Sequence, residues 1–119
     1  MRRLTALALA ALAAPALTGC TVMQRISEGA YRNAVADGAA AELAARGVRL
    51  DGRLSCATPG TGSPSVVRIR CTGRTVDGSP VAVTGVATAA DTPRPREHYV
   101  VAVDGRALLR TDCLGRACR

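Results

Sequence analysis

The chain has 119 residues and a formal net charge of +7, and all 16 of its basic residues are arginine. It contains no Phe or Trp and only two Tyr, so it lacks the aromatic platforms on which single-stranded nucleic acids stack. This length fits one domain, and the basic balance favours acidic partners other than nucleic acid, such as anionic lipid headgroups or acidic polymers.

The N-terminal segment has the three-part plan of a secretory signal. Arg2 and Arg3 form its positive start, and the apolar run over residues 4–17 is interrupted only by Thr5 and Pro15. A transmembrane helix is the first alternative, but spanning a bilayer takes about 20 apolar residues and this run is shorter. The segment therefore predicts export rather than a membrane span.

The export signal ends in Leu-Thr-Gly-Cys at residues 17–20. This junction resembles the lipobox of bacterial lipoproteins, in which the Cys receives lipid and becomes the new N-terminus. We expect residues 1–19 to be a lipoprotein signal peptide, with Cys20 as the lipidation site. Residues 20–26 are then a short lipid-anchored linker, and residues 27–119 form one domain at the extracytoplasmic face of the cell membrane. The alternative is an ordinary export signal followed by a chance Cys.

Cleavage changes the size and charge of the chain only modestly. Removing 19 of the 119 residues leaves 100, and losing Arg2 and Arg3 leaves 14 of the 16 arginines against nine acidic residues, a net charge of +5. A core without Phe or Trp must be built from Val, Leu, Ile and Ala, and a small domain buries a smaller fraction of its surface than a large one. We therefore expect covalent cross-links to add to the stability of the domain.

The cysteines of the chain can supply these cross-links as disulfide bonds. With Cys20 assigned to lipid, four remain, and an even number in an exported chain indicates two disulfides. Three pairings are possible. We favour Cys56–Cys71, because a hairpin would bring them together, and Cys113–Cys118, which would close a small terminal loop. Neither the short spacings of a zinc site nor a redox C-x-x-C occurs, so we expect no metal and no cofactor.

From Ser27 to Arg46 the apolar residues recur near the helical period, with Ser27 as the expected N-cap and Gly47 as the residue just past the end. The expected buried stripe is Ile26, Ala30, Ala34, Val35, Ala39 and Leu43. Gly29 and Gly38 each cost about 1 kcal/mol relative to Ala inside a helix. The helix is therefore expected to be stable only when packed.

After Gly47 the hydrophobic period changes to two, which predicts strands. The expected strands cover residues 48–56, 65–76, 80–90, 97–103 and 107–111. Asp-Gly dipeptides at 77–78 and 104–105 are hairpin signals. Residues 57–64 are a turn-rich loop, and residues 91–96 carry two prolines that a central strand does not tolerate.

The alternation also assigns faces to these strands. The expected inward residues are Val48, Leu50, Gly52, Leu54, Val67, Ile69, Cys71, Val81, Val83 and Val86, and the expected outward residues include Arg49, Asp51, Arg53, Arg68 and Arg70. One helix followed by strands gives an α+β fold: a helix packed on a four- to five-stranded antiparallel sheet, stapled by disulfides. The helix is expected to cover one face and the arginines to occupy the other.

Residues 27–90 resemble an uncharacterised domain of small actinobacterial lipoproteins. The likeness lies in Leu54-Ser55-Cys56 at the end of one strand, Cys71-Thr72 in the next, and the Asp77-Gly78 turn before Val81-Ala82-Val83. In that family the first Cys is typically followed by Pro, whereas Ala57 follows it here and Pro comes at position 59. The tail Asp91–Arg119 lies outside the pattern. The resemblance implies a secreted, disulfide-bonded domain and no particular activity.

Two features that resemble catalytic or phosphate-binding elements are better explained by structure. His98 is the only His, and catalysis needs a converging set of groups that this sequence does not show, so we expect a strand-surface His. The Gly-rich residues 57–64 lack the Lys and the spacing of a phosphate loop and are expected to be a hairpin loop. We expect no catalytic residue.

The arginines are the one feature that points to a binding site. Arg68, Arg70 and Arg74 share one strand parity, and Arg94 and Arg96 follow in the Pro-rich connection. Guanidinium groups aligned on one face can bind phosphate or carboxylate groups in bidentate fashion, so these five are candidate anion-binding residues. The alternative is a solvated, Arg-rich surface without a ligand.

Together these observations predict a non-enzymatic, membrane-anchored lipoprotein that acts as an interaction module of the cell envelope. Its expected contacts are membrane lipid through acylated Cys20, and anionic lipid, an acidic envelope polymer or a protein partner through the arginines. Two alternatives stay open: a small-ligand carrier with a pocket between helix and sheet, and an accessory or inhibitor subunit of an exported enzyme.

Overall fold

The structure is a computed structural model that describes residues 19–115 and 118, with side chains from residue 28 onward. The signal segment predicted for residues 1–19 lies outside this part except for the backbone of Gly19, and the side chain of Cys20 is outside it as well. One helix is followed by five strands: α1 (Gly19–Ala45), β1 (Ser55–Ala57), β2 (Val66–Arg74), β3 (Pro80–Thr88), β4 (Arg96–Val103) and β5 (Arg106–Thr111).

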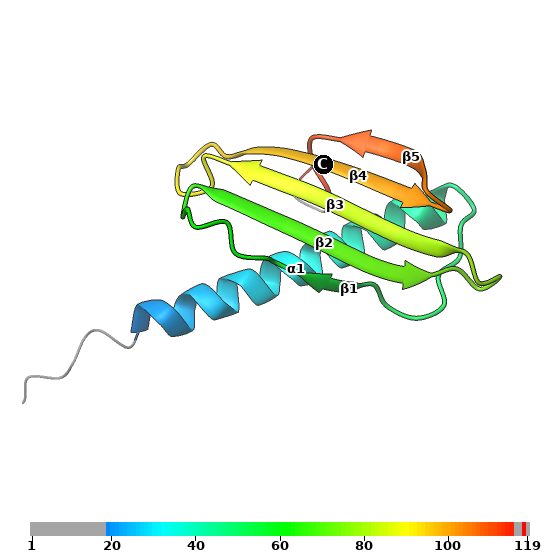
Figure 1. The fold of residues 1–119 in the computed structure, drawn as a ribbon, viewed down its shortest axis with the longest axis horizontal. Coiled ribbons are helices and arrows are strands. Elements are labelled where there is room, and N and C mark those ends of the chain that lie inside the picture. Colours follow the sequence, from blue (N-terminus) through cyan, green and yellow to red (C-terminus); the bar gives the residue numbers. More distant parts are fainter. Residues whose placement is uncertain (1–18, 116–117, 119) are drawn as a thin grey trace, which may run out of the picture.

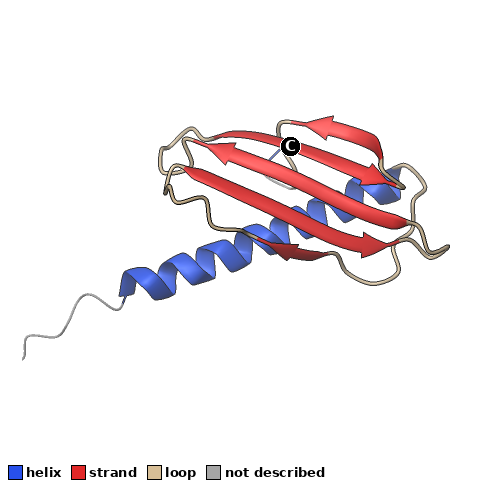
Figure 2. Ribbon diagram, viewed as in Figure 1, coloured by secondary structure: helices blue, strands red, loops and turns tan. Residues whose placement is uncertain are grey.

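The strands form a single antiparallel sheet in the order β1-β2-β3-β4-β5, so each strand pairs with its neighbour in sequence. α1 lies across one face of this sheet (Figures 1 and 2). The predicted fold class, one helix on an antiparallel sheet, is confirmed. Within the described residues, no helix has the length and hydrophobicity that a membrane span requires.

α1 begins earlier than predicted. Ser27, the expected N-cap, lies inside the helix, which starts at Gly19, so the N-cap prediction is wrong. The end matches the prediction: Gly47 has φ +76°, and the amide of Val48 donates to the carbonyl of Leu43 at 2.9 Å. With the Gly47 amide on the Ala44 carbonyl, this is the Schellman arrangement, and only Gly adopts that φ without strain.

The buried side of α1 also differs from the predicted stripe. Val35, Ala39 and Leu43 are buried as expected, but Ala30 and Ala34 are exposed. In their place the half-buried Tyr31 and the buried Ala36 and Gly38 face the domain. Residues spaced by four lie on one helix face, and a Tyr–Val–Ala–Leu line buries more apolar area than a line built on two alanines.

The first predicted strand, residues 48–56, is mostly wrong as secondary structure. Only β1 is a strand; upstream of it Leu50 makes a single bridge to Thr75, and Gly52 takes φ +82°, which interrupts the extended backbone. The alternation nevertheless predicts which apolar residues are buried, although the inward prediction for Gly52 is wrong because Gly52 is exposed. Leu54 is buried, and Val48 and Leu50 pack against the core.

Both predicted hairpins form. β2 and β3 are joined by a turn in which Gly78 has φ +88° and the Thr75 amide donates to the Ser79 carbonyl. β4 and β5 are joined through Asp104 and Gly105, both with positive φ, as a type I′ turn requires.

In β3 the inward prediction for Val86 is wrong. Val86 pairs with Arg68 and therefore lies on the outer face, whereas Gly85 and Ala87 take the inward positions. A Cβ on Gly85 would lie 2.4 Å from Cδ1 of Tyr99, so the ring occupies the space of the missing side chain. The strand keeps its regular alternation, and the Tyr ring supplies the bulk that Gly lacks.

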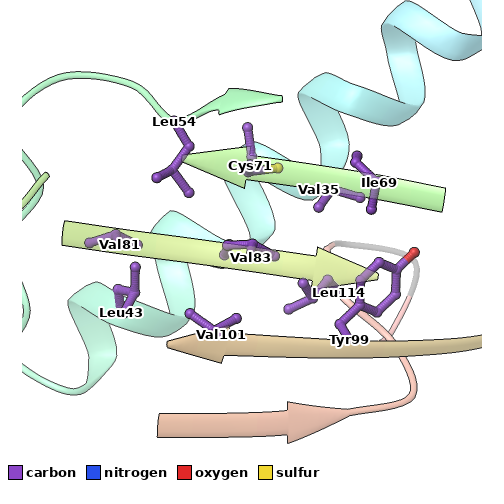
Figure 3. Packing of buried hydrophobic residues seen from close by; sticks show 12 residues of the cluster. Val35, Leu43, Leu54, Ile69, Cys71, Val81, Val83, Tyr99, Val101 and Leu114 are labelled. Carbon is purple, nitrogen blue, oxygen red and sulfur yellow. The ribbon is translucent and has the colours of Figure 1, made fainter. Parts of the chain in front are cut away.

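The core lies between α1 and the inner face of the sheet (Figure 3). Its buried hydrophobic residues are Val35, Ala36, Ala39, Leu43, Leu54, Ile69, Cys71, Val81, Val83, Ala87, Tyr99, Val101 and Leu114. Tyr99 is the largest fully buried side chain. No buried side-chain nitrogen or oxygen in the described residues lacks a hydrogen-bond partner, as expected for a well-packed interior.

Two disulfides close this core, in the pairing that the sequence favours. Cys56 and Cys71 are bonded between paired positions of β1 and β2, and Cys113 is bonded to Cys118 in the terminal loop. This loop packs on the helix. A Cβ on Gly38 would lie 2.7 Å from the Gly115 nitrogen, so a Gly inside α1 allows the loop to approach.

We expect Gly85→Ala to lower the free energy of unfolding by about 1–3 kcal/mol, because the new methyl group overlaps the buried ring of Tyr99. Urea unfolding followed by circular dichroism measures it. Gly29→Ala is the matched control: nothing lies within 4 Å of its Cβ position. In this helix position the same substitution should stabilise by about 1 kcal/mol. Equal effects at both sites would contradict the packing described here.

The two disulfides should differ in their effect on stability. In the chain-entropy account, replacing Cys56 and Cys71 (15 residues apart) by Ala costs about 3 kcal/mol, and replacing Cys113 and Cys118 (five apart) costs about 2 kcal/mol. Cys71 is fully buried and Cys118 is exposed, which widens the difference. Urea unfolding of the two double variants tests the order, and a larger loss at the terminal pair would contradict it.

Candidate functional site

The outer face of the sheet carries the candidate site. In antiparallel pairing, residues directly opposite each other project to the same face. Arg70 is thereby in one cross-strand row with Thr84, Val100 and Arg110. This row runs across β2, β3, β4 and β5 and has an arginine at each end.

The neighbouring rows add further cationic side chains. Arg68 shares its row with Val86 and His98, and Arg96 is in the next row with Thr88. We call the outward arginines of the sheet the arginine face: Arg68, Arg70, Arg74, Arg96 and Arg110. All five side chains are exposed.

Four of the five predicted anion-binding residues therefore share the outer face of the sheet, with Arg74 and Arg96 at opposite ends of the strands. The fifth, Arg94, is exposed in the connection between β3 and β4 and has no place in the strand register. Arg74 is at the far end of β2 and donates to the Gly78 carbonyl at 3.1 Å. Arg110 was not among the predicted residues, although the alternation along residues 107–111 would have placed it on the outer face. The sequence pattern does not reveal the register shift between Val101 and Ala102.

Carboxylates neutralise arginines on the helix side of the molecule, away from this face. Arg46 pairs with Glu42 at 2.7 Å and Arg53 with Asp37 at 3.0 Å, and both acids belong to α1. In the described part of the chain, no carboxylate lies within ion-pair distance of an arginine of the arginine face. Within these residues the arginines of this face are therefore unpaired, although Asp112 lies at its margin beside His98.

The surface between the arginines is built from small and medium-sized side chains. It consists of Ala82, Thr84, Val86, Val100 and Ala102. Neither Tyr of the chain is on it, because Tyr99 is buried on the inner side and Tyr31 belongs to α1. Recognition on this face must rest on charge and hydrogen bonding rather than on aromatic stacking.

His98 lies at the margin of the arginine face. Its Nδ1 is 3.4 Å from Oδ1 of Asp112, and both side chains are more than half exposed. This agrees with the predicted strand-surface His. Within the described residues no group of three or more His, Cys, Asp or Glu is placed to hold a metal ion.

A pair of tyrosines that was not predicted from the sequence, the half-buried Tyr31 and the buried Tyr99, joins α1 to the inner face of the sheet. The hydroxyls of Tyr31 and Tyr99 share a hydrogen bond of 2.8 Å, and Tyr99 donates to Oε1 of Glu97 at 3.3 Å. Burial raises the pKa of Tyr99 strongly, and the hydrogen bond to Tyr31 and the carboxylate of Glu97 raise it further. Burial also raises the pKa of Tyr31.

Two hollows flank α1. One, of about 540 Å³, lies between the helix and residues 48–54, and the other, of about 920 Å³, lies between the helix and the terminal disulfide loop. Neither runs between α1 and the central strands β2, β3 and β4, where the carrier alternative places its ligand. The carrier alternative therefore stays a prediction.

No protein-family model matches this chain, and no curated protein or solved structure is detectably similar to it. The resemblance to actinobacterial lipoprotein domains therefore stays a prediction that rests on the residues quoted for it.

The tyrosine pair predicts a loss of stability at alkaline pH. Because both pKa values are raised in the folded state, the unfolded chain loses its tyrosine protons first once the pH passes the ordinary value of 10.0. The free energy of unfolding should be flat below that pH and fall above it. Urea unfolding at a series of pH values up to about 11 measures the slope.

Tyr31→Phe serves as the matched variant, since it keeps the ring and removes one of the two titrating groups. It should lower the free energy of unfolding by about 1 kcal/mol at neutral pH. It should also make the alkaline slope shallower. An unchanged slope would show that Tyr31 titrates normally in the folded protein.

Proposed function

We propose that this protein is a bacterial lipoprotein, anchored through acylated Cys20 at the outer side of the cell membrane. There it works as a non-enzymatic interaction module of the envelope. Residues 1–19 are removed as its signal peptide. The arginine face is its contact surface and engages an anionic component of the envelope.

The observation that carries this proposal is the set of five exposed arginines on the outer sheet face, none of which has a carboxylate partner among the described residues. By contrast, Arg46 and Arg53 pair with Glu42 and Asp37 of α1. Unpaired guanidinium groups on one face attract anions over a distance and bind phosphate or carboxylate in bidentate fashion.

The disulfides support the location. Two bonds in a domain of this size are typical of oxidising compartments outside the cytoplasm. The lipobox at residues 17–20 then supplies the reason for membrane attachment. A single acyl chain binds membranes only weakly and two or more bind stably, so the number of chains on Cys20 decides how firmly the domain is held.

The anchoring is tested by intact mass spectrometry of the native protein from the membrane fraction. We expect a chain that starts at Cys20 and carries acyl mass, and that gains about 4 Da on reduction, two hydrogens for each disulfide. Cys20→Ser should remove the acyl mass and release the protein from the membrane fraction. The Cys113→Ser/Cys118→Ser variant, which keeps Cys20, should stay there. A membrane-free, unlipidated wild-type chain would overturn the proposal.

A further inference from the structure

We propose that the arginine face binds a linear polymer that carries an anionic phosphate group in each repeat, lying across the strands of the sheet. This inference rests on the proposed function and names the ligand class of its contact surface. Lipid headgroups, free phosphate and folded proteins are the other anionic partners. The arrangement of the arginines and the binding experiment distinguish them from the polymer.

The spacing of the arginines fits an extended anion better than a single one. Arg68 and Arg70 are two residues apart on β2, about 7 Å along the strand. Arg70 and Arg110 are three strand spacings apart in one row, about 14 Å. Arg96 is in the row of Val66, eight residues along β2 from Arg74, which separates these two arginines by about 26 Å along the strands. One phosphate is too small to contact both, whereas a chain with repeated phosphates can.

The surface between the arginines fits the backbone of such a chain. Thr84 and Val100 lie between Arg70 and Arg110, and Ala82 and Ala102 form the adjacent row. These side chains are short, so they leave room for a strand-like ligand to lie flat. The absence of an aromatic ring on this described surface disfavours sugar or base stacking and leaves the charged phosphate as the recognised group.

The position of the anchor argues against a membrane as the ligand. α1 lies on the opposite side of the sheet from the arginine face and is continuous from Gly19, so its start projects beyond the sheet as a helix (Figure 1). A helical connection from Cys20 leaves no flexible tether there. If the arginine face lay on the bilayer, α1 would be on the side of the sheet that points away from the membrane. It would then be raised above the sheet by roughly the 10 Å between packed layers.

Binding is measured with the purified full-length lipidated protein in detergent and fluorescently labelled long-chain inorganic polyphosphate as the probe. Fluorescence anisotropy gives the affinity at several salt concentrations. Flotation with vesicles of phosphatidylglycerol, compared with phosphatidylcholine, measures the lipid alternative, and inorganic phosphate serves as a competitor. We expect polyphosphate to bind in a salt-sensitive way, because binding releases counterions. Free phosphate should compete poorly.

The decisive variant is Arg70→Glu/Arg110→Glu, which reverses both ends of the central row. It should weaken polyphosphate binding by about tenfold or more. Arg53→Glu/Arg106→Glu is the matched control: both residues are exposed and off the arginine face, since Arg53 pairs with Asp37 of α1 and Arg106 pairs with the inward Val103. The control should change binding by about twofold at most, through net charge alone. Arg70→Gln/Arg110→Gln, a milder change, guards against loss of folding.

Three results would overturn the inference: no polyphosphate binding by the wild-type protein, equal losses in the face and control variants, or tighter arginine-dependent binding to phosphatidylglycerol vesicles than to polyphosphate. Each can occur with Cys20 fully lipidated, and the proposed anchoring would then still stand. An unlipidated native chain would instead overturn the anchoring and leave the measured affinity for polyphosphate as it is.

Discussion

The packing of one helix against one face of the sheet is the interaction on which the rest of this structure depends. With no Phe or Trp, the interface is made of small aliphatic side chains and a single large one, Tyr99. Its ring fills the space over Gly85, and the side chain of Leu54 does the same over Gly73. Large groups beside glycines give a close fit that alanines and valines alone would not achieve. The hydroxyl of Tyr99 is then held by Tyr31 and Glu97, which fixes α1 in position along the strands.

Covering one face leaves the other in water, and this asymmetry creates the candidate site. The sheet positions that point away from α1 need not be apolar, so the alternation that buries Ile69 and Val83 also projects Arg68 and Arg70 outward. The same layer order places the acids of α1 on the opposite side, where they pair with Arg46 and Arg53. The core and the candidate binding surface thus lie on separate faces, and substitutions on the arginine face are expected to have little effect on the core.

The two disulfides reinforce the edge strand β1 and the terminal loop that follows β5. Cys56–Cys71 fastens the three-residue edge strand β1 to β2, which few hydrogen bonds could hold. Cys113–Cys118 shapes a loop whose Leu114 enters the core and whose backbone rests on Gly38 of α1. The Gly residue that weakens the isolated helix is therefore the one that lets the terminal loop close the core beside it.

The sequence by itself determined the fold class, the four longer strands and both Asp-Gly hairpins, because these follow from local periodicity and turn chemistry. It left three disulfide pairings possible and favoured the one that forms. It also predicted Arg68 and Arg70 as outward residues, since parity within one strand is local. Only the tertiary structure decided which face of α1 is buried, the end of the extended backbone at Gly52, the inward position of Gly85 and the meeting of Tyr31 with Tyr99. Those depend on contacts between residues far apart in the chain. The same holds for Arg110, which joins Arg70 only through the register of four strands.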